Sequence, residues 1–262
     1  MTIARLDQFG FLAIDGRDAV SFLQGYTTCD LTRLNTSDTT PGAICNIQGR
    51  MIANFIAART EHGLLVRLDR QLVPVVIDFL TKYIVFSKAT MQDASDAWAS
   101  VGLIDVPAIA GAAVSMIRPD GRIECWVTAD DAPAGDDKGE WQAAEVAAGI
   151  AWVTTASSGE YIPQMFGLHD QGAIDFDKGC YLGQEIVARM QYRGELKKRL
   201  HIASISGVAV GDAVSGDDGK ALGEVVATSE SHALAVLRNT EEAVSGQVPG
   251  GETTLFRVVQ TA

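Results

Sequence analysis

The segment DFDKGCYLGQEIVARMQYRGELKKRL, residues 175–200, has the residue types and spacing that are best suited to chemistry. Glycines let the backbone turn tightly around Cys180, and residues 184–191 have the pattern of a helix. We therefore expect the Cys180 thiol close to a helix N-terminus, where free amides and the nearby Lys178 favour the thiolate. A thiolate can attack an electrophile, exchange with a disulfide or hold a metal transiently. The alternative is that Cys180 only packs beneath the turn.

The same segment is a positive island in an acidic chain. Between Lys178 and Arg199 there are six basic and two acidic residues, whereas the whole chain has 21 Lys and Arg against 33 Asp and Glu, a net charge of −12. Such a charge repels DNA and anionic membranes, so we expect neither as a partner. The island could hold a carboxylate- or phosphate-bearing ligand locally, or it could be a solvated helix face.

Composition limits the class of protein. With 262 residues, 47% of them hydrophobic and 21% charged, the chain can form one large domain or two to three small ones. It has no apolar run of about 18 residues and no secretory signal at its start, which predicts a soluble cytoplasmic protein. The four cysteines form no C-x-x-C pair, so we expect neither a built-in metal site nor a disulfide framework. At least one thiol is then free for reactivity.

The first third of the chain alternates strand and helix signals. Residues 9–15 predict a strand, and Asp18 is placed to cap a short helix that Gly25 ends. Residues 43–60 predict a hairpin about Gln48-Gly49, followed by a strand at 63–69 with Leu64, Val66 and Leu68 on one face. The next expected elements are a helix over 70–83 and a strand over 84–93.

Later elements are short and joined by turns. A hairpin is expected about residues 120–122, and a helix over 140–149 should close at Gly149. From Leu200 onward, short β-like runs between glycines predict a small terminal β-barrel or sandwich. Because adjacent strands are mostly joined by hairpins, a mixed α+β architecture fits better than a doubly wound parallel sheet. Nucleotide-binding fingerprints are missing.

The motif K-G-C-Y-x-G-Q-E, residues 178–185, resembles the signature of the YgfZ-type folate-binding proteins. The resemblance extends over nearly the whole chain in the same order, through residues 22–31, 80–91, 158–164 and 187–200. These proteins are grouped with the aminomethyltransferase (T-protein) of the glycine cleavage system. The resemblance implies a three-lobed aminomethyltransferase-like fold that binds tetrahydrofolate in a central hole. Residues 1–195 would form the folate-binding region, with two interleaved subdomains and the inner one at roughly 46–110, and residues 196–262 the small C-terminal β-barrel.

The resemblance also implies a function. It is that of an accessory protein that binds tetrahydrofolate or another reduced folate and acts in iron–sulfur cluster assembly or repair. We expect the protein to be a monomer. Its partners would be iron–sulfur client proteins or assembly factors, and cluster-dependent tRNA-modifying enzymes would depend on it. In the implied site Cys180 is the functional thiol and Lys178 its electrostatic neighbour, and Gln184 and Glu185 are helix-start residues that position the loop. For the folate, Phe9 and Trp141 would form the pterin platform. Arg189 and Arg193 would bind the tail carboxylates. At Phe9 related sequences have Trp, so stacking is kept but an N–H donor is lost.

Two other functions stay open. A true aminomethyltransferase would carry an Asp-Asp pair, to which Ala53-Asn54 corresponds here. An amide cannot hold the negative charge that methylene transfer requires, which argues against glycine-cleavage activity, and whether any reaction is catalysed is open. The third possibility is a non-catalytic docking protein whose Lys197 and Lys198 recognise an acidic client.

Overall fold

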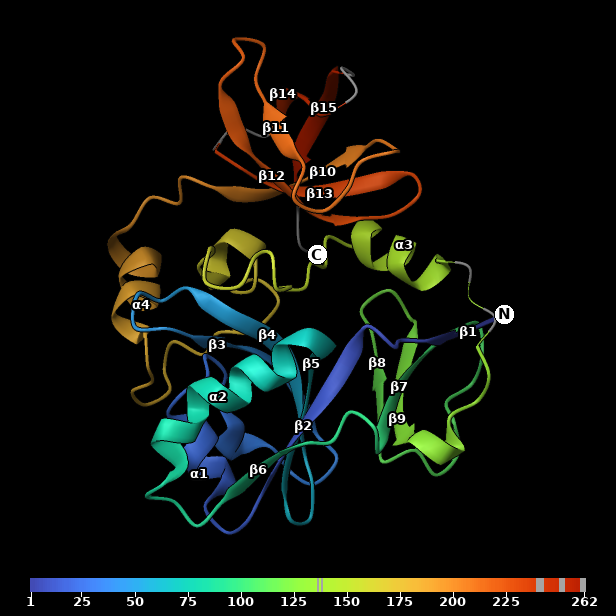
Figure 1. Cartoon of the computed structure of the whole chain (residues 1–262), viewed down its shortest axis with the longest axis vertical. Coiled ribbons are helices and arrows are strands. Elements are labelled where there is room, and N and C mark those ends of the chain that lie inside the picture. Colours follow the sequence, from blue (N-terminus) through green and yellow to red (C-terminus); the bar gives the residue numbers. More distant parts are fainter. Residues whose placement is uncertain (136, 138, 239–242, 250–252, 260–262) are drawn as a thin grey trace.

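Three antiparallel β-structures form the framework of the described chain, as Figure 1 shows. They are a five-stranded sheet, a four-stranded sheet beside it, and a closed six-stranded barrel above both. The structure is a computed structural model, and it describes residues 1–135, 137, 139–238, 243–249 and 253–259. The mixed α+β architecture and the terminal barrel confirm the sequence-based predictions.

The five-stranded sheet has the order β3-β4-β5-β2-β6. Its strands are β2 (Phe9–Asp15), β3 (Thr39–Cys45), β4 (Met51–Arg59), β5 (Gly63–Asp69) and β6 (Thr90–Asp93). The predicted hairpin is β3–β4, and its turn places Gly49 at φ +70°, a conformation that glycine adopts without strain.

Two helices cover one face of this sheet: α1 (Ala19–Gln24) and α2 (Val73–Ile84). Helix α1 ends at Gly25 as predicted, but the carboxylate of Asp18 makes no capping bond to the helix and instead accepts the backbone N–H of Lys88 at 2.7 Å. The predicted strand over 84–93 shrinks to β6. Strand β6 begins at Thr90, which pairs with Asp15, the last residue of β2. Residues 85–89 therefore lie beyond the end of their partner strand, and Phe86 among them is 96% exposed.

The four-stranded sheet has the order β1-β7-β9-β8 and covers the other face of the first sheet. Its strands are β1 (Thr2–Arg5), β7 (Trp98–Ile104), β8 (Val114–Ile117) and β9 (Ile123–Thr128), with the predicted hairpin turn between β8 and β9. Phe11, Leu65 and Trp126 belong to the core between the two sheets. Strand β5 is therefore buried on both faces, and Leu64, Val66 and Leu68 share one of them as predicted.

The barrel has the strand order β10-β13-β12-β11-β14-β15. Its strands are β10 (Arg199–Ser204), β11 (Ala213–Ser215), β12 (Ala221–Thr228), β13 (His232–Leu237), β14 (Ala243–Gln247) and β15 (Thr253–Val258). Helices α3 (Glu140–Ala147) and α4 (Gln184–Arg193) lie below it.

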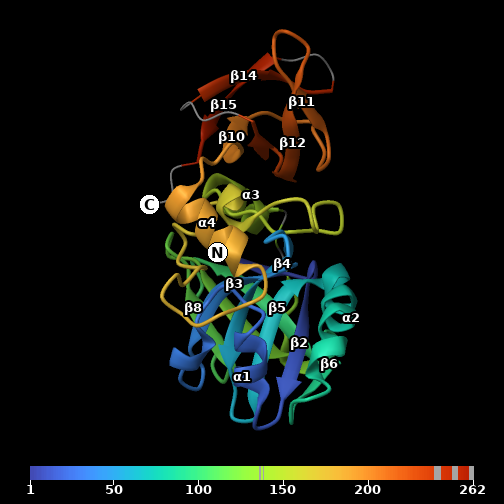
Figure 2. The same ribbon diagram turned by 90° about the vertical axis from the view of Figure 1, so that its left-hand side faces the viewer.

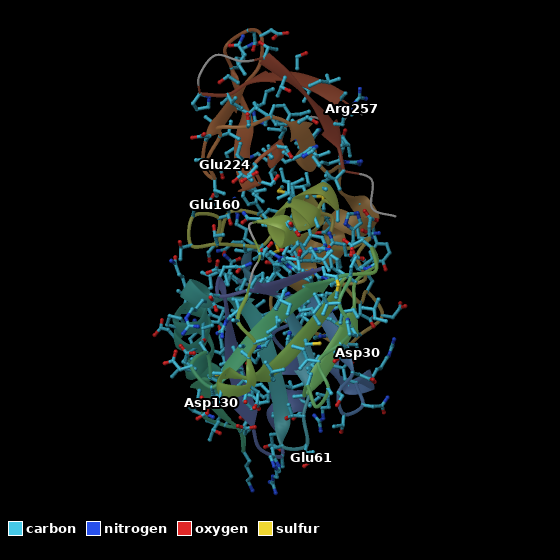
Figure 3. All side chains as sticks on the ribbon, turned by 90° about the vertical axis from the view of Figure 1, so that its right-hand side faces the viewer. Asp30, Glu61, Asp130, Glu160, Glu224 and Arg257 are labelled. Carbon is cyan, nitrogen blue, oxygen red and sulfur yellow. The ribbon has the colours of Figure 1, made fainter. Side chains whose placement is uncertain are left out.

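The barrel and the sheets are one packed body. A single apolar core includes Val66 of β5, Phe166 of the connecting segment and Leu234 of the barrel. The Tyr161 hydroxyl donates a hydrogen bond to the Glu224 carboxylate, which Figure 3 shows at the lower rim of the barrel. Among the described residues no helix is both long and apolar enough to cross a membrane.

The predicted domain limits stay predictions. Residue 46 lies in the β3–β4 turn of the first sheet, and residue 110 lies between β7 and β8 of the second. The limit between 195 and 196 falls in the segment that joins α4 to β10.

The barrel contains a buried histidine that predicts acid sensitivity. His201 is fully buried, and its Nδ1 lies 2.8 Å from the carbonyl oxygen of Arg199, which can only accept. The Nε2 atom of His201 has no hydrogen-bond partner in the described part of the chain. Burial lowers the pKa of the His201 imidazole below the ordinary 6.5. Because the unfolded chain takes up this proton first, the contribution of His201 to the free energy of unfolding is complete above about pH 6.5 and is lost as the pH falls from there toward the folded pKa.

We expect the free energy of unfolding, measured in urea between pH 7.5 and 5, to fall more steeply with decreasing pH for the wild type than for His201→Gln. The difference between the two slopes should correspond to the uptake of up to one proton on unfolding. The exposed His62 offers the matched control His62→Gln, which should behave as the wild type. Equal slopes for wild type and His201→Gln would contradict the prediction.

Candidate functional site

Cys180 is the one cysteine that is accessible. All four cysteines lie in the described part of the chain and are free, but Cys29, Cys45 and Cys125 are buried. Burial raises the pKa of the Cys29 and Cys45 thiols to about 12, so both stay protonated and unreactive at neutral pH. A partner or reagent in solution can reach only the Cys180 thiol.

Lys178 anchors the Cys180 loop. Its ammonium group is buried and donates three hydrogen bonds, to the carbonyl oxygens of Gln24 at 2.8 Å, Thr27 at 2.6 Å and Cys29 at 2.7 Å. All three donors are thereby used, and burial lowers the lysine pKa. The sequence predicted Lys178 as an electrostatic neighbour of the thiol; the structure places its charge against backbone carbonyls of residues 24–29.

A second anchor follows Cys180. The Leu182 N–H donates to the carbonyl oxygen of Gly25 at 3.0 Å. Gly183 has φ +85°, and a Cβ there would lie 2.5 Å from the carbonyl oxygen of Asn46, so only glycine fits. Helix α4 begins at the next residue, with Gln184 and Glu185 in its first turn as predicted. Cys180 therefore lies on an exposed bend that is fixed on both sides.

The two rings of the predicted pterin platform lie in one buried cluster. Trp141 is fully buried, with the Arg122 guanidinium 4.4 Å from its ring centroid and Gly102 so close that a Cβ there would be 2.3 Å from a ring carbon. In this conformation Trp141 has no face open to a pterin. Phe9 is also buried, but it lines a cavity of about 200 Å³ together with Trp98.

The predicted cations for a folate tail are not near these rings. Arg189 and Arg193 are exposed on α4, at the left edge of the molecule in Figure 1, whereas α3 and β1 lie toward the right. Figure 2, seen from that left-hand side, has α4 in front. The structure thus separates Arg189 and Arg193 from Phe9 and Trp141. Arg5 and Arg70 line the Phe9 cavity instead, and they are paired with Asp7 and Asp96.

Sequence reasoning missed a buried ion cluster beside Phe9. Arg67 Nε lies 2.9 Å from Glu124 Oε1, and both side chains are fully buried. None of the three guanidinium nitrogens of Arg67 has a hydrogen-bond partner in the described part of the chain. The guanidinium lies 3.7 Å from the Phe9 ring centroid and 4.3 Å from that of Trp152, so charge and ring contacts hold it.

The other half of the cluster is the pair Arg118–Glu145, with 3.0 Å between Arg118 Nη2 and Glu145 Oε1. Burial raises the pKa of Glu145, and Arg118 only partly offsets this. At Glu124 burial is outweighed by the two guanidinium groups and by hydrogen bonds from Trp126 and Ser100, so its pKa is lowered. A signal existed in the sequence, because Arg67 and Glu124 are each flanked by apolar residues inside a strand.

Asn54 has a structural role. It is buried, its Nδ2 donates to the carbonyl oxygen of Ala151 at 2.9 Å, and its Oδ1 accepts the N–H of Val153 at 2.7 Å. A carboxylate here could not donate to Ala151. The position that corresponds to an acid of the T-proteins therefore holds the segment 151–153 against β4.

The fold that carries this site is that of the aminomethyltransferases. The crystal structure of the glycine cleavage system aminomethyltransferase T from Bartonella henselae matches 98% of this chain and 84% of its own, with a TM-score of 0.74 and 12% sequence identity. At that identity the likeness shows the fold alone.

Sequence relatives give the family. The tRNA-modifying protein YgfZ of Vibrio atlanticus is 30% identical to this chain, over 78% of this chain and 70% of the relative. The protein of the same name from Klebsiella pneumoniae is 29% identical, over 94% of this chain and 90% of the relative. An uncharacterized protein of Haemophilus influenzae is 34% identical, over 76% of this chain and 72% of the relative. No family model matches the chain. The chain belongs to the YgfZ family.

Proposed function

We propose that this protein binds a reduced folate and serves as an accessory factor in iron–sulfur cluster assembly or repair, supporting cluster-dependent enzymes that include tRNA-modifying ones. The family relation and the names of its relatives support a role in tRNA modification. The observation that carries the proposal is the exposed Cys180 on a bend fixed by Lys178 and Leu182. The proposal includes a monomer in the cytoplasm, where a reducing milieu suits four free thiols.

Fixing the bend favours thiol chemistry. An exposed loop normally loses conformational entropy when it engages a partner. Here Lys178 and Leu182 hold the backbone on both sides of Cys180 before any partner arrives. Cys180 can then act as a nucleophile or as a transient metal ligand at a lower entropic cost.

The Phe9 cavity is the proposed entry for the pterin. Its volume of about 200 Å³ is below the roughly 300–1,000 Å³ of pockets that enclose drug-sized ligands, so it would take the pterin end and leave the rest of the folate outside. Phe9 and Trp98 supply aromatic walls, and Arg5 and Arg70, which also line the cavity, are the cations proposed for the carboxylates. Trp141 would support Phe9 from within the core. When bound, a reduced folate supplies a one-carbon carrier.

The test separates thiol, folate and docking functions. In cells that depend on this protein, Cys180→Ser should lower cluster-dependent tRNA modification at least tenfold. The same variant should bind tetrahydrofolate within twofold of the wild type by calorimetry, at micromolar Kd, roughly −8 kcal/mol. The matched comparison is Lys197→Glu with Lys198→Glu, which should leave the modification in place.

A silent Cys180→Ser combined with loss of function in the lysine variant would replace the thiol proposal by the docking one. A flat titration of the wild type with tetrahydrofolate would remove the folate part.

A further inference from the structure

A second cavity, of about 250 Å³, lies between the barrel and the segment that follows Tyr161. The 3-10 helix Pro163–Phe166 with the loop after it forms one wall, and β10 with the end of β15 forms another. The third wall is the connection from α4 to β10, which Figure 1 shows rising along the left side of the molecule. Neither Cys180 nor Phe9 lines this cavity, so it is separate from the sites described above.

Gln164 lines this cavity and has one acceptor atom that forms no hydrogen bond with the described residues. The residue is 3% exposed and lines the cavity, and its Nε2 donates to the carbonyl oxygen of Val187 at 2.7 Å. That bond fixes the amide, and its Oε1 is buried without a hydrogen-bond partner in the described part of the chain. A buried acceptor without a donor costs free energy. A ligand with an N–H donor would remove that cost.

The charged groups of the cavity are one cation and one anion. Arg199 is exposed and lines the cavity, and none of the ion pairs of the described residues includes it. Asp170 is also exposed, with its Oδ2 3.5 Å from His169 Nε2. Arg199 would attract a simple anion, but Asp170 would repel it. For a simple cation, Asp170 would attract and Arg199 would repel. A molecule with both charges satisfies the two residues together.

The remaining wall is apolar and limits size. Phe166, Leu196, Leu200 and Val258 line the cavity, and its volume is below the range of drug-sized pockets. We propose that this cavity binds a small α-amino acid with a short aliphatic side chain. The carboxylate lies against Arg199, the ammonium group donates to Gln164 Oε1 and faces Asp170, and the side chain contacts the apolar wall.

Calorimetry on the full chain tests the proposal, with glycine, L-alanine and L-valine as probes. At least one of them should bind saturably at millimolar concentration or below, and acetate and methylammonium should bind at least tenfold more weakly because each lacks one charge. Arg199→Gln should weaken binding at least tenfold, as expected for a lost charge-assisted hydrogen bond. Arg257→Gln, an exposed arginine of the same barrel that Figure 3 labels, should stay within twofold of the wild type.

Asp170→Asn provides a second exposed variant that tests the ammonium contact, and it should bind several-fold more weakly. Thermal unfolding of each variant confirms that it folds. Absence of saturable binding by all three amino acids would overturn the proposal. It would also be overturned by acetate binding as tightly as the amino acids, or by Arg199→Gln and Asp170→Asn both retaining wild-type affinity.

Discussion

Arg67→Met is expected to lower the free energy of unfolding by about 3–5 kcal/mol. Arg67 and Glu124 are both fully buried, with 2.9 Å between their nearest charged atoms. Removing the guanidinium leaves the Glu124 carboxylate in the core with Arg118 at 3.8 Å as its remaining ion-pair partner. Methionine fills the volume of the arginine stem, so the loss comes from the weaker pairing of the buried Glu124 charge rather than from a cavity. Urea denaturation at pH 7 measures it.

Two further variants separate this charge effect from a general loss of packing. In the double variant Arg67→Met with Glu124→Gln the buried charge is gone, so part of the lost stability should return. Arg70→Met removes a surface arginine that is paired with Asp96, and it should change stability little because exposed pairs contribute little. If single and double variants are equally unstable, the charge argument is wrong.

Lys178→Met is expected to lower the free energy of unfolding by about 3 kcal/mol. The variant leaves three carbonyl groups, of Gln24, Thr27 and Cys29, without their shared donor, at about 1 kcal/mol each. Since these bonds fix the Cys180 bend, we also expect faster amide hydrogen exchange in residues 22–31 and 178–183. Denaturation with hydrogen-exchange mass spectrometry measures both effects.

The control is Lys197→Met, because Lys197 is exposed and lies beyond α4. It should leave stability and exchange as in the wild type. Lys178→Arg should not restore stability, because a planar guanidinium cannot direct three donors to carbonyls that surround a single ammonium group. Unchanged exchange in Lys178→Met would mean that other contacts fix the bend.

Local structure was largely predictable from the sequence. The strand at 9–15, the helix after Asp18, the β3–β4 hairpin and the terminal barrel follow from apolar periodicity and turn residues. The predicted strand over 84–93 failed because periodicity does not say whether a neighbouring element covers a segment, and Phe86 is left exposed.

The site was predictable only in part. The motif around Cys180 marked the loop and the start of α4, because glycines and helix starts are local features. The partners of Lys178 come from residues 24–29, far away in the sequence, and the spacing carried no information about them. For the same reason the predicted site combined Phe9 of β2 with Arg189 of α4, two elements that Figure 1 shows apart.

The sequence by itself determined the elements, the family and the cysteine motif, because each depends on the order of nearby residues. Only the tertiary structure decided which charges meet. It paired Arg67 of β5 with Glu124 of β9, enclosed Trp141 between Arg122 and Gly102, and committed both ends of the Asn54 amide to residues 151 and 153. These contacts join residues that are distant in the chain, and burial makes each of them strong enough to fix the role of its side chain.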